Sequence, residues 1–213
     1  MSIPKIASYQ MPKYDIYPLN KTNWRLDPEN SVLLVHDMQQ YFLDFYDTQA
    51  APIPALIEYS KQLISTARTL DIPVVYTAQS GDQSLEHRQL LTDFWGTGLR
   101  ADPAITKIHD ELQPASQDIV LEKWRYSAFK FSNLEERMIS WKRKQLVICG
   151  VYAHIGCLMS AAEAFMLNIQ PFMVSDALAD FSLEEHEMAL KYGSTRCAQI
   201  MSTHQIIQQW TKK

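Results

Sequence analysis

The stretch Ser31–Tyr41, SVLLVHDMQQY, organises the rest of the chain. Its four consecutive apolar residues, 32–35, run directly into His36 and Asp37. A short, wholly apolar run is typical of a strand that is buried on both faces, in the middle of a parallel sheet. Because ligands of α/β proteins bind outside the carboxyl ends of such strands, Asp37 lies where chemistry is usually done. Aspartate is also a favoured helix N-cap, and position alone leaves both interpretations open.

Strands and helices alternate along the rest of the chain. The predicted strands after the first are 74–79 (VVYTAQ), 119–122, 145–150 (QLVICG), 171–177 and 200–203, and the predicted helices are 52–70, 84–94, 133–143, 156–168, 183–199 and 205–210. This alternation predicts a three-layer α/β/α Rossmann-like domain, with a mainly parallel sheet of about six strands and helices on both faces. We expect one domain over residues 31–213, preceded by an extended, proline-rich arm, residues 1–30, packed on it.

Composition excludes several classes of protein. The chain has 213 residues, 46% hydrophobic and 21% charged, with a net charge of −4, so it lacks the basic footprint of a nucleic-acid-binding protein. It has neither an apolar run of the roughly 20 residues that a membrane span needs nor the apolar centre of a signal peptide, and a cytosolic protein is therefore expected. Its three cysteines show no metal-ligand spacing and are expected to be reduced thiols. We expect no metal and no cofactor.

Polar groups end several of the predicted strands. Asp37 and Lys123 each follow a strand directly, Gln79 is the last residue of another, and the turn 150–156 follows a fourth. Since parallel strands end at one edge of their sheet, these groups should lie together there. An acid and an amine held together can stabilise each other's charge and orient a substrate carboxylate. The spacing predicts an enzyme that acts on a small molecule, without saying which.

Six strings carry a resemblance to a known family: LLVHDMQQYF, VVYTAQ, LLTDFWGTG, LEKWRYSAF, GVYAHIGC and DALADFS. In this order they resemble the isochorismatases of siderophore and phenazine pathways. The wider superfamily, the cysteine hydrolases, includes nicotinamidases and uses an Asp, a Lys and a nucleophilic Cys. Asp37 and Lys123 match the first two, whereas Gly156 occupies the position of the nucleophile.

The glycine selects the chemistry that the resemblance implies. A cysteine at a helix N-terminus could attack a carbonyl, but Gly156 cannot, and Cys157 lies about 100° further around the helix. The remaining chemistry is the hydrolysis of the enol ether of isochorismate, which starts with protonation of its vinyl carbon. Asp37 is the expected general acid, and Lys123 is expected to be engaged by a substrate carboxylate. The D-x-H element by which some relatives bind a metal is missing, because Phe45 and Tyr46 follow Asp44.

The resemblance also implies a substrate pocket. Gln79, Arg88 and Tyr152 match positions that bind the substrate's carboxylates and ring hydroxyl. Phe42 and Trp95 match apolar walls, although a plain core role is almost equally compatible with their residue types.

At the turn after the fourth strand, the resemblance implies a cis peptide bond between Val151 and Tyr152. Gly156 should make room for the substrate and offer its backbone N–H, at a helix N-terminus, to an anionic group.

Partners follow from the same resemblance. We expect a homo-oligomer, a dimer at least, with the aromatic segment 124–131 as part of the interface. The resemblance also implies docking to a siderophore synthetase, and no aryl carrier domain is expected. The substrate's ring substituent, a hydroxyl or an amino group, stays open. Two other functions are less favoured, a nicotinamidase-type amidohydrolase because of Gly156, and a non-catalytic synthetase partner because of Asp37 and Lys123.

Overall fold

A central parallel sheet determines the architecture. The protein's structure is a computed structural model, which describes residues 3–13 and 20–212. Within these residues, six strands form one sheet in the order β3-β2-β1-β4-β5-β6, all neighbours being parallel. The strands are β1 (Ser31–His36), β2 (Val74–Ala78), β3 (Ile119–Glu122), β4 (Gln145–Val151), β5 (Gln170–Ala179) and β6 (Gln199–Met201).

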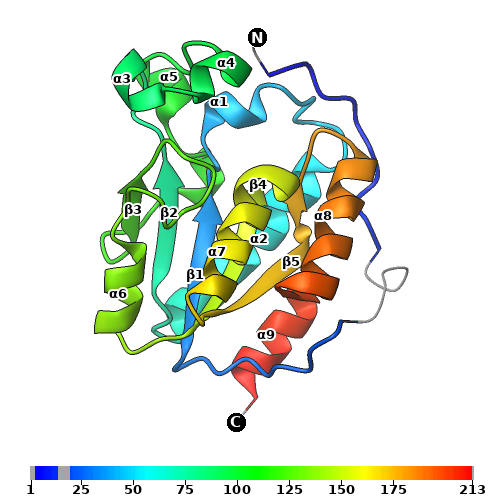
Figure 1. Cartoon of the computed structure of the whole chain (residues 1–213). Coiled ribbons are helices and arrows are strands. Elements are labelled where there is room, and N and C mark those ends of the chain that lie inside the picture. Colours follow the sequence, from blue (N-terminus) through cyan, green and yellow to red (C-terminus); the bar gives the residue numbers. More distant parts are fainter. Residues whose placement is uncertain (1–2, 14–19, 213) are drawn as a thin grey trace.

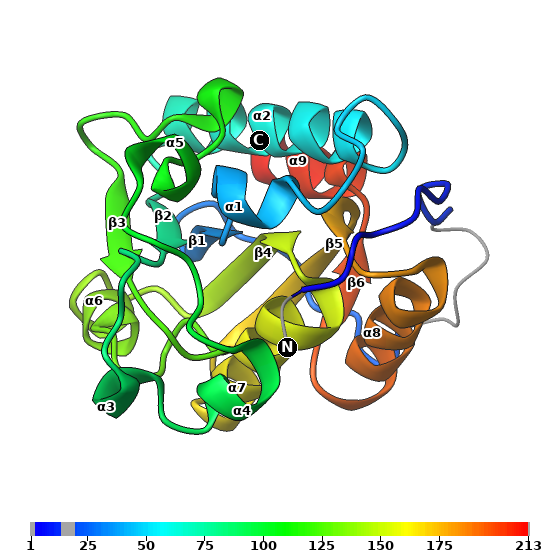
Figure 2. The ribbon, with the colours of Figure 1, turned by 90° about the horizontal axis from the view of Figure 1, so that it is seen from above.

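Helices cover both faces of the sheet, which confirms the predicted fold class. Figures 1 and 2 show α2 and α9 on one face and α6, α7 and α8 on the other. The helices are α1 (Gln40–Leu43), α2 (Ile53–Thr69), α3 (Leu85–Arg88), α4 (Leu91–Trp95), α5 (Pro103–Thr106), α6 (Leu134–Ser140), α7 (Leu158–Met166), α8 (Leu183–Arg196) and α9 (Thr203–Thr211), with a 3₁₀ turn at Asp110–Leu112 and a π-helical turn at Ala153–Cys157.

Each face of the sheet has its own hydrophobic core, and β1 contributes to both. Leu33 and Val35 pack in the core under α2 and α9, whereas Val32 and Leu34 pack in the core under α6, α7 and α8. All four side chains are fully buried. The apolar run therefore forms a strand buried on both faces, as predicted, because successive side chains of a strand point to opposite faces.

The N-terminal residues run along the domain without a helix or strand in the described parts, 3–13 and 20–30. Ile3, Ile6 and Leu26 are buried in the core on the α2 side. Residues 14–19 of the predicted arm lie outside the described residues, and the division into arm and domain stays a prediction. No helix in the described part of the chain is long and apolar enough to cross a membrane.

The segment between β2 and β3 departs from the prediction. The predicted single helix over 84–94 is two short helices, α3 and α4, because Gln89 between them has a left-handed backbone (φ 46°), which a helix interior does not accept. Two further short helices, α1 and α5, were not predicted; each has four residues, too few to give a helical period.

Candidate active site

The structure brings the predicted polar residues together at the carboxyl edge of the sheet. Asp37 follows β1, Gln79 follows β2 and Lys123 follows β3, while β4 continues into the turn that contains Gly156. One cavity at this edge is lined by all eight residues predicted for the site: Asp37, Phe42, Gln79, Arg88, Trp95, Lys123, Tyr152 and Gly156.

Two donors hold the carboxylate of Asp37 in this cavity. Lys123 Nζ donates to Oδ2 at 2.7 Å, and the hydroxyl of Thr77 donates to Oδ1 at 2.6 Å. Thr77 Oγ1 in turn accepts the backbone N–H of Asp37 at 3.0 Å. The exposed fractions of Asp37 and Lys123 are only 6% and 1%. The acid and the amine therefore form a buried, hydrogen-bonded pair whose geometry is set by three adjacent strands.

The backbone of Asp37 turns sharply where β1 ends. Its φ of 49° lies in the left-handed region, which among non-glycine residues is best tolerated by Asn and Asp. This conformation takes the chain off the strand within one residue. Strained backbone conformations cluster at functional sites, and here the strained residue is the predicted acid.

Opposing effects act on the pKa of Asp37. Burial alone would raise it, but the electrostatic effects of His36 and Lys123 and the hydrogen bonds from Lys123 and Thr77 together hold it below its ordinary value. Of these, the Lys123 ammonium is the main persistent charge, because burial lowers the pKa of His36 to about 4. In the free site the carboxylate is therefore ionised at neutral pH.

Gly156 lies in the first turn of a helical segment that begins three residues before the predicted start. The helical segment starts earlier, with the π-helical turn Ala153–Cys157 that leads into α7, and Gly156 lies inside this turn. The space beside Gly156 is also filled, since a Cβ at this position would come within 2.1 Å of Cε1 of His36. The glycine thus makes room for the imidazole of His36.

The turn after β4 is built as predicted at its first peptide bond, which is cis between Val151 and Tyr152. The hydroxyl of Tyr152 donates to the carbonyl oxygen of Phe42 at 2.8 Å. Its ring lies 4.5 Å, centroid to centroid, from that of Phe181, and both rings line the cavity. Because its hydroxyl is engaged by the protein, Tyr152 presents an aromatic ring to the cavity, and its expected role in binding the substrate stays a prediction.

Arg88 and Gln79 offer polar groups at the cavity wall. Arg88 is 3% exposed, and its guanidinium donates from Nε to the carbonyl oxygen of Gly96 at 2.9 Å. A Cβ at Gly98 would come within 2.3 Å of Nη1 of Arg88, so the second glycine of the WGTG loop is required for this placement. Gln79 is held through its backbone by the buried side chain of Gln39, which leaves the Gln79 side chain for the cavity.

Aromatic residues of α4 and of the loop after β3 line the cavity and contact each other. The indole N–H of Trp95, in α4, donates to the hydroxyl of Tyr126 in the loop after β3 at 2.8 Å. Nearby, the ring of His87 stacks on Trp124 at 5.1 Å between centroids. The segment from α3 to α4 is therefore joined to the loop after β3 by side-chain contacts.

Sequence reasoning missed several residues that contact the predicted ones. Thr77 lies inside β2, and a polar side chain in a buried strand next to Gln79 was the available signal. His36 was not among the predicted site residues, although its position directly before Asp37 was an available signal. Tyr126 and Phe181 belong to loops, where periodicity carries no information.

Comparisons with known proteins identify the family. The model of the isochorismatase domain matches residues 31–205. The chain belongs to the isochorismatase family. It is similar to the isochorismatase of Bacillus subtilis (strain 168), with 52% identity over 98% of this chain and 67% of that protein. It is also similar to enterobactin synthase component B of Escherichia coli (strain K12), with 45% identity over 97% of this chain and 73% of that protein.

A third relative of the isochorismatase family is matched over its whole length. Phenazine biosynthesis protein PhzD1 of Pseudomonas aeruginosa is 44% identical over 97% of this chain and 99% of that protein. Among solved structures, a cysteine hydrolase from Pseudomonas syringae pv. phaseolicola 1448A superposes with a TM-score of 0.77 over 91% of this chain and 97% of that one, at 19% identity. This last likeness shows the shared fold. The resemblance to isochorismatases is thereby confirmed, and the chain is a hydrolase of this family.

The cysteines of this isochorismatase-family protein are all buried. Burial raises the pKa of Cys149 to about 12 and that of Cys197 to about 11, and it raises the pKa of Cys157 well above its ordinary value. We therefore expect Cys149→Ala, Cys157→Ala and Cys197→Ala each to keep turnover within about twofold, because a thiol that stays protonated is a poor nucleophile. Stoichiometric alkylation of Cys157 that tracked loss of activity would contradict this.

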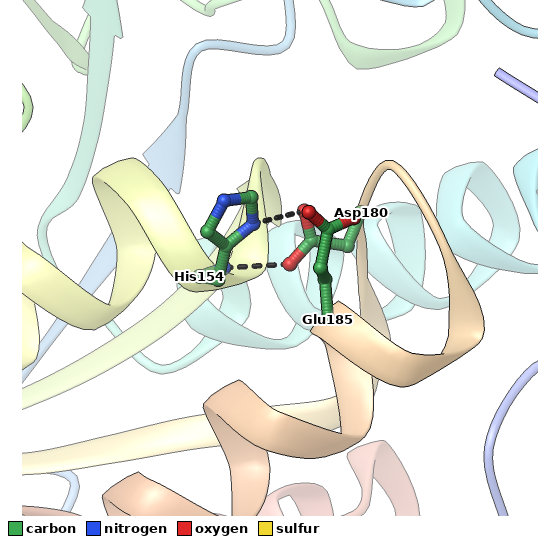
Figure 3. A group of neighbouring side chains, drawn as sticks. All are labelled: His154, Asp180 and Glu185. Atoms are coloured by element: carbon green, nitrogen blue, oxygen red, sulfur yellow. Dashed lines mark hydrogen bonds and ion pairs between the residues drawn. The ribbon is translucent and has the colours of Figure 1, made fainter.

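One further group of side chains within the described residues brings possible metal ligands together. The ligand atoms of His154, Asp180 and Glu185 lie within 4.8 Å of one another (Figure 3). Asp180 is already used by protein donors, since Oδ2 accepts the backbone N–H of His154 at 2.7 Å and Oδ1 pairs with its Nδ1 at 2.6 Å. Burial alone would lower the pKa of His154, but the bonded carboxylate raises it. A cation would have to displace this shared proton. We therefore describe the group as a hydrogen-bonded cluster in which the ring of His154 also contacts that of Phe181.

Proposed function

We propose that this chain is an isochorismatase, which hydrolyses the enol-pyruvyl ether of isochorismate to pyruvate and 2,3-dihydro-2,3-dihydroxybenzoate. The observation that carries the proposal is the buried pair of Asp37 and Lys123, 2.7 Å apart, in a cavity whose nucleophile position is a glycine. The residues that line this cavity include a carboxyl group and an ammonium group but no thiol. The names of the relatives, an isochorismatase and an enterobactin synthase component, support the same reaction.

The proposed reaction needs one proton transfer from the protein. Protonated Asp37 gives its proton to the vinyl CH₂ carbon of the substrate, and the electron pair of the double bond forms the new C–H bond. The resulting oxocarbenium ion is captured by water, whose proton returns to the Asp37 carboxylate. The hemiketal then collapses to pyruvate and the ring alcohol. Because protonation of carbon is the slow step in enol ether hydrolysis, a single positioned acid supplies most of the catalysis.

Substrate binding supplies the protonated acid. The free carboxylate is stabilised by Lys123, as its lowered pKa indicates. A substrate with two carboxylates raises the pKa of Asp37 by like charge, and it engages the Lys123 ammonium at the same time. Arg88 and Gln79 are proposed to bind the substrate's polar groups, and Phe42 and Trp95 to exclude bulk water.

The order of two pH midpoints tests this account. The pH dependence of kcat/KM reports the free enzyme, where the pKa of Asp37 is lowered, whereas that of kcat reports the substrate complex, where it is raised. Activity depends on the protonated acid, so both parameters fall as the pH rises. We expect kcat/KM to fall at a lower pH than kcat. Coinciding midpoints, or the reverse order, would show that substrate does not raise the pKa of the acid.

A product assay tests the function itself. Pyruvate release should be measured with isochorismate and with 2-amino-2-deoxyisochorismate, beside ammonia release from nicotinamide. We expect pyruvate and no ammonia. A higher kcat/KM for the amino compound would assign the chain to a phenazine pathway, which the likeness to the phenazine protein keeps as the alternative. Ammonia release, or no turnover of either enol ether, would refute the proposal.

We further propose a homodimer at least, with the segment 124–131 in its interface, and docking to a siderophore synthetase. Two large apolar side chains of this segment are exposed, Tyr126 by 37% and Phe131 by 62%, and Ile139 on α6 is exposed by 68%. Sedimentation at micromolar concentration should give twice the 24.6 kDa of the chain or more. We expect Phe131→Asp to lower this mass, whereas Phe165→Asp, a matched change on α7, should not. A monomer mass for the unaltered protein would contradict the proposal.

A further inference from the structure

The ring of His36 fills the space that a side chain on residue 156 would occupy. An ideal Cβ on Gly156 would lie 2.1 Å from Cε1 of His36, 2.7 Å from Nε2 and 2.9 Å from Nδ1. All three distances are shorter than any contact that a real Cβ makes. The imidazole therefore occupies the place that a side chain on residue 156 would take, and either residue 156 is glycine or the ring must leave.

From this place the ring contacts the two segments that enclose the acid. Nδ1 of His36 lies 2.8 Å from the carbonyl oxygen of Val151, the last residue of β4. Nε2 lies 3.1 Å from the carbonyl oxygen of Tyr126, in the loop after β3. Nδ1 is also 3.7 Å from Oδ2 of Asp37. The His36 ring, on β1, thus contacts both the end of β4 and the loop after β3.

A neutral ring donates from one nitrogen only. Burial favours the neutral form, since the His36 side chain is 1% exposed. The shorter of the two contacts assigns the proton to Nδ1, which donates to Val151. In this tautomer Nε2 and the carbonyl oxygen of Tyr126 are both acceptors, so they make no hydrogen bond and their contact is repulsive.

We propose that His36 and Gly156 form a matched pair, in which the His36 ring replaces the side chain of a catalytic nucleophile and positions the turn after β4 beside the general acid. His36 is a positioning residue in this proposal, acting through Val151 and Asp37. The pair thereby selects the type of reaction. While the ring is in place, there is no space for a nucleophilic side chain on residue 156, and the site is left to a reaction that needs only protonation of the substrate. The kinetic part rests on the proposed function, whereas the steric part does not.

A double-mutant cycle tests the steric part without any substrate. The variants Gly156→Ala, His36→Ala and their combination are unfolded in urea, and their free energies of unfolding are compared. We expect Gly156→Ala alone to be the most destabilised, and His36→Ala to rescue it, so that the effects are strongly non-additive. If Gly156→Ala does not fold, recovery of folded protein in the double variant gives the same answer. Additive effects, or no loss of stability in Gly156→Ala, would overturn the proposal.

Gly193, in α8, provides the matched control. A Cβ there would first meet Sδ of Met173 at 3.0 Å, and His36 is not among its three nearest contacts. Gly193→Ala and His36→Ala should therefore have additive effects on stability. Coupling of the same size in both cycles would mean that His36→Ala loosens the whole core, and the pairing with Gly156 would be refuted.

Conservative variants test the positioning part. The side-chain nitrogen of Asn takes roughly the place of Nδ1, and that of Gln the place of Nε2. We expect His36→Asn to keep kcat within about tenfold, and His36→Gln and His36→Leu to lower it about 10²-fold with little change in KM, because small displacements of a catalytic group carry costs of this order. Equal kcat values for the Leu variant and the unaltered enzyme would overturn the positioning role.

A spectroscopic measurement on the unaltered protein completes the test. The ¹⁵N shifts of the His36 ring should show a neutral imidazole with its proton on Nδ1 at neutral pH. A proton on Nε2 would overturn the assigned bond to Val151. Since neither this measurement nor the stability cycle uses isochorismate, failure of the matched pair is distinguishable from failure of the proposed reaction.

Discussion

Replacing Asp37 by Asn should lower kcat by at least the 10²- to 10⁴-fold that is typical of a lost general acid, ~3–5 kcal/mol in activation free energy. Asn is the appropriate substitute, because it tolerates the left-handed backbone at this position (φ 49°) and can still accept the bond from Thr77. It cannot release a proton to carbon. Stopped assays of pyruvate release, with circular dichroism to verify the fold, measure the effect.

Asp176 offers a matched control for this substitution. It is a largely buried carboxylate on β5 that also accepts hydrogen bonds, from the backbone N–H of Thr203 at 2.8 Å and from its hydroxyl at 2.7 Å, and it does not line the cavity. Asp176→Asn should keep most of the activity. If Asp37→Asn retains more than about a tenth of the unaltered rate, Asp37 is not the acid.

The second large effect is expected for Lys123→Met. Breaking a buried ion pair by removing one partner costs about 3–5 kcal/mol of stability, because the other charge is left buried and unpaired. Asp37 can reduce this cost by taking up a proton, so its pKa in the folded state should rise above the unfolded value. We also expect KM to rise, since the substrate carboxylate loses its ammonium partner.

The pH dependence of stability shows whether the unpaired Asp37 carboxylate causes the loss of stability in Lys123→Met. In the unaltered protein the folded-state pKa of Asp37 is lowered, so its stabilising contribution is present above the unfolded pKa and is lost as the pH falls. In Lys123→Met the folded state binds the extra proton, and stability should instead fall as the pH rises. Urea unfolding at pH 5 and pH 8 measures this fall in the variant, whereas the unaltered protein, in which the pKa of Asp37 lies below both pH values, should show no change from this group. The exposed Lys144→Met is the control, and a loss that is equal at both pH values would contradict the explanation.

The fold was predictable because its decisive signals are local. The apolar run before His36 predicts a doubly buried strand, and side chains of β1 indeed enter both cores. The positions of Asp37 and Lys123 followed from the rule that parallel strands end at one edge. Neither step requires knowledge of distant contacts.

The unpredicted features depend on geometry between distant residues. The fit of the His36 ring beside Gly156 depends on the direction of a Cβ that glycine lacks, so neither residue type reveals it. The break between α3 and α4 depends on a left-handed φ at Gln89, a residue that is common inside helices. The engaged hydroxyl of Tyr152 depends on a carbonyl oxygen 110 residues earlier in the chain.

The buried pair of Asp37 and Lys123 has a consequence for how the protein acquires activity during folding. Its partners are 86 residues apart in sequence, and Thr77, 40 residues from Asp37, completes the arrangement. Contacts of such separation form slowly, because the intervening chain must be ordered first. The site therefore exists only after β1, β2 and β3 have assembled, and no fragment that ends before β3 can contain it. Recovery of catalysis in a refolding experiment would accordingly report completion of this half of the sheet, later than the formation of α2.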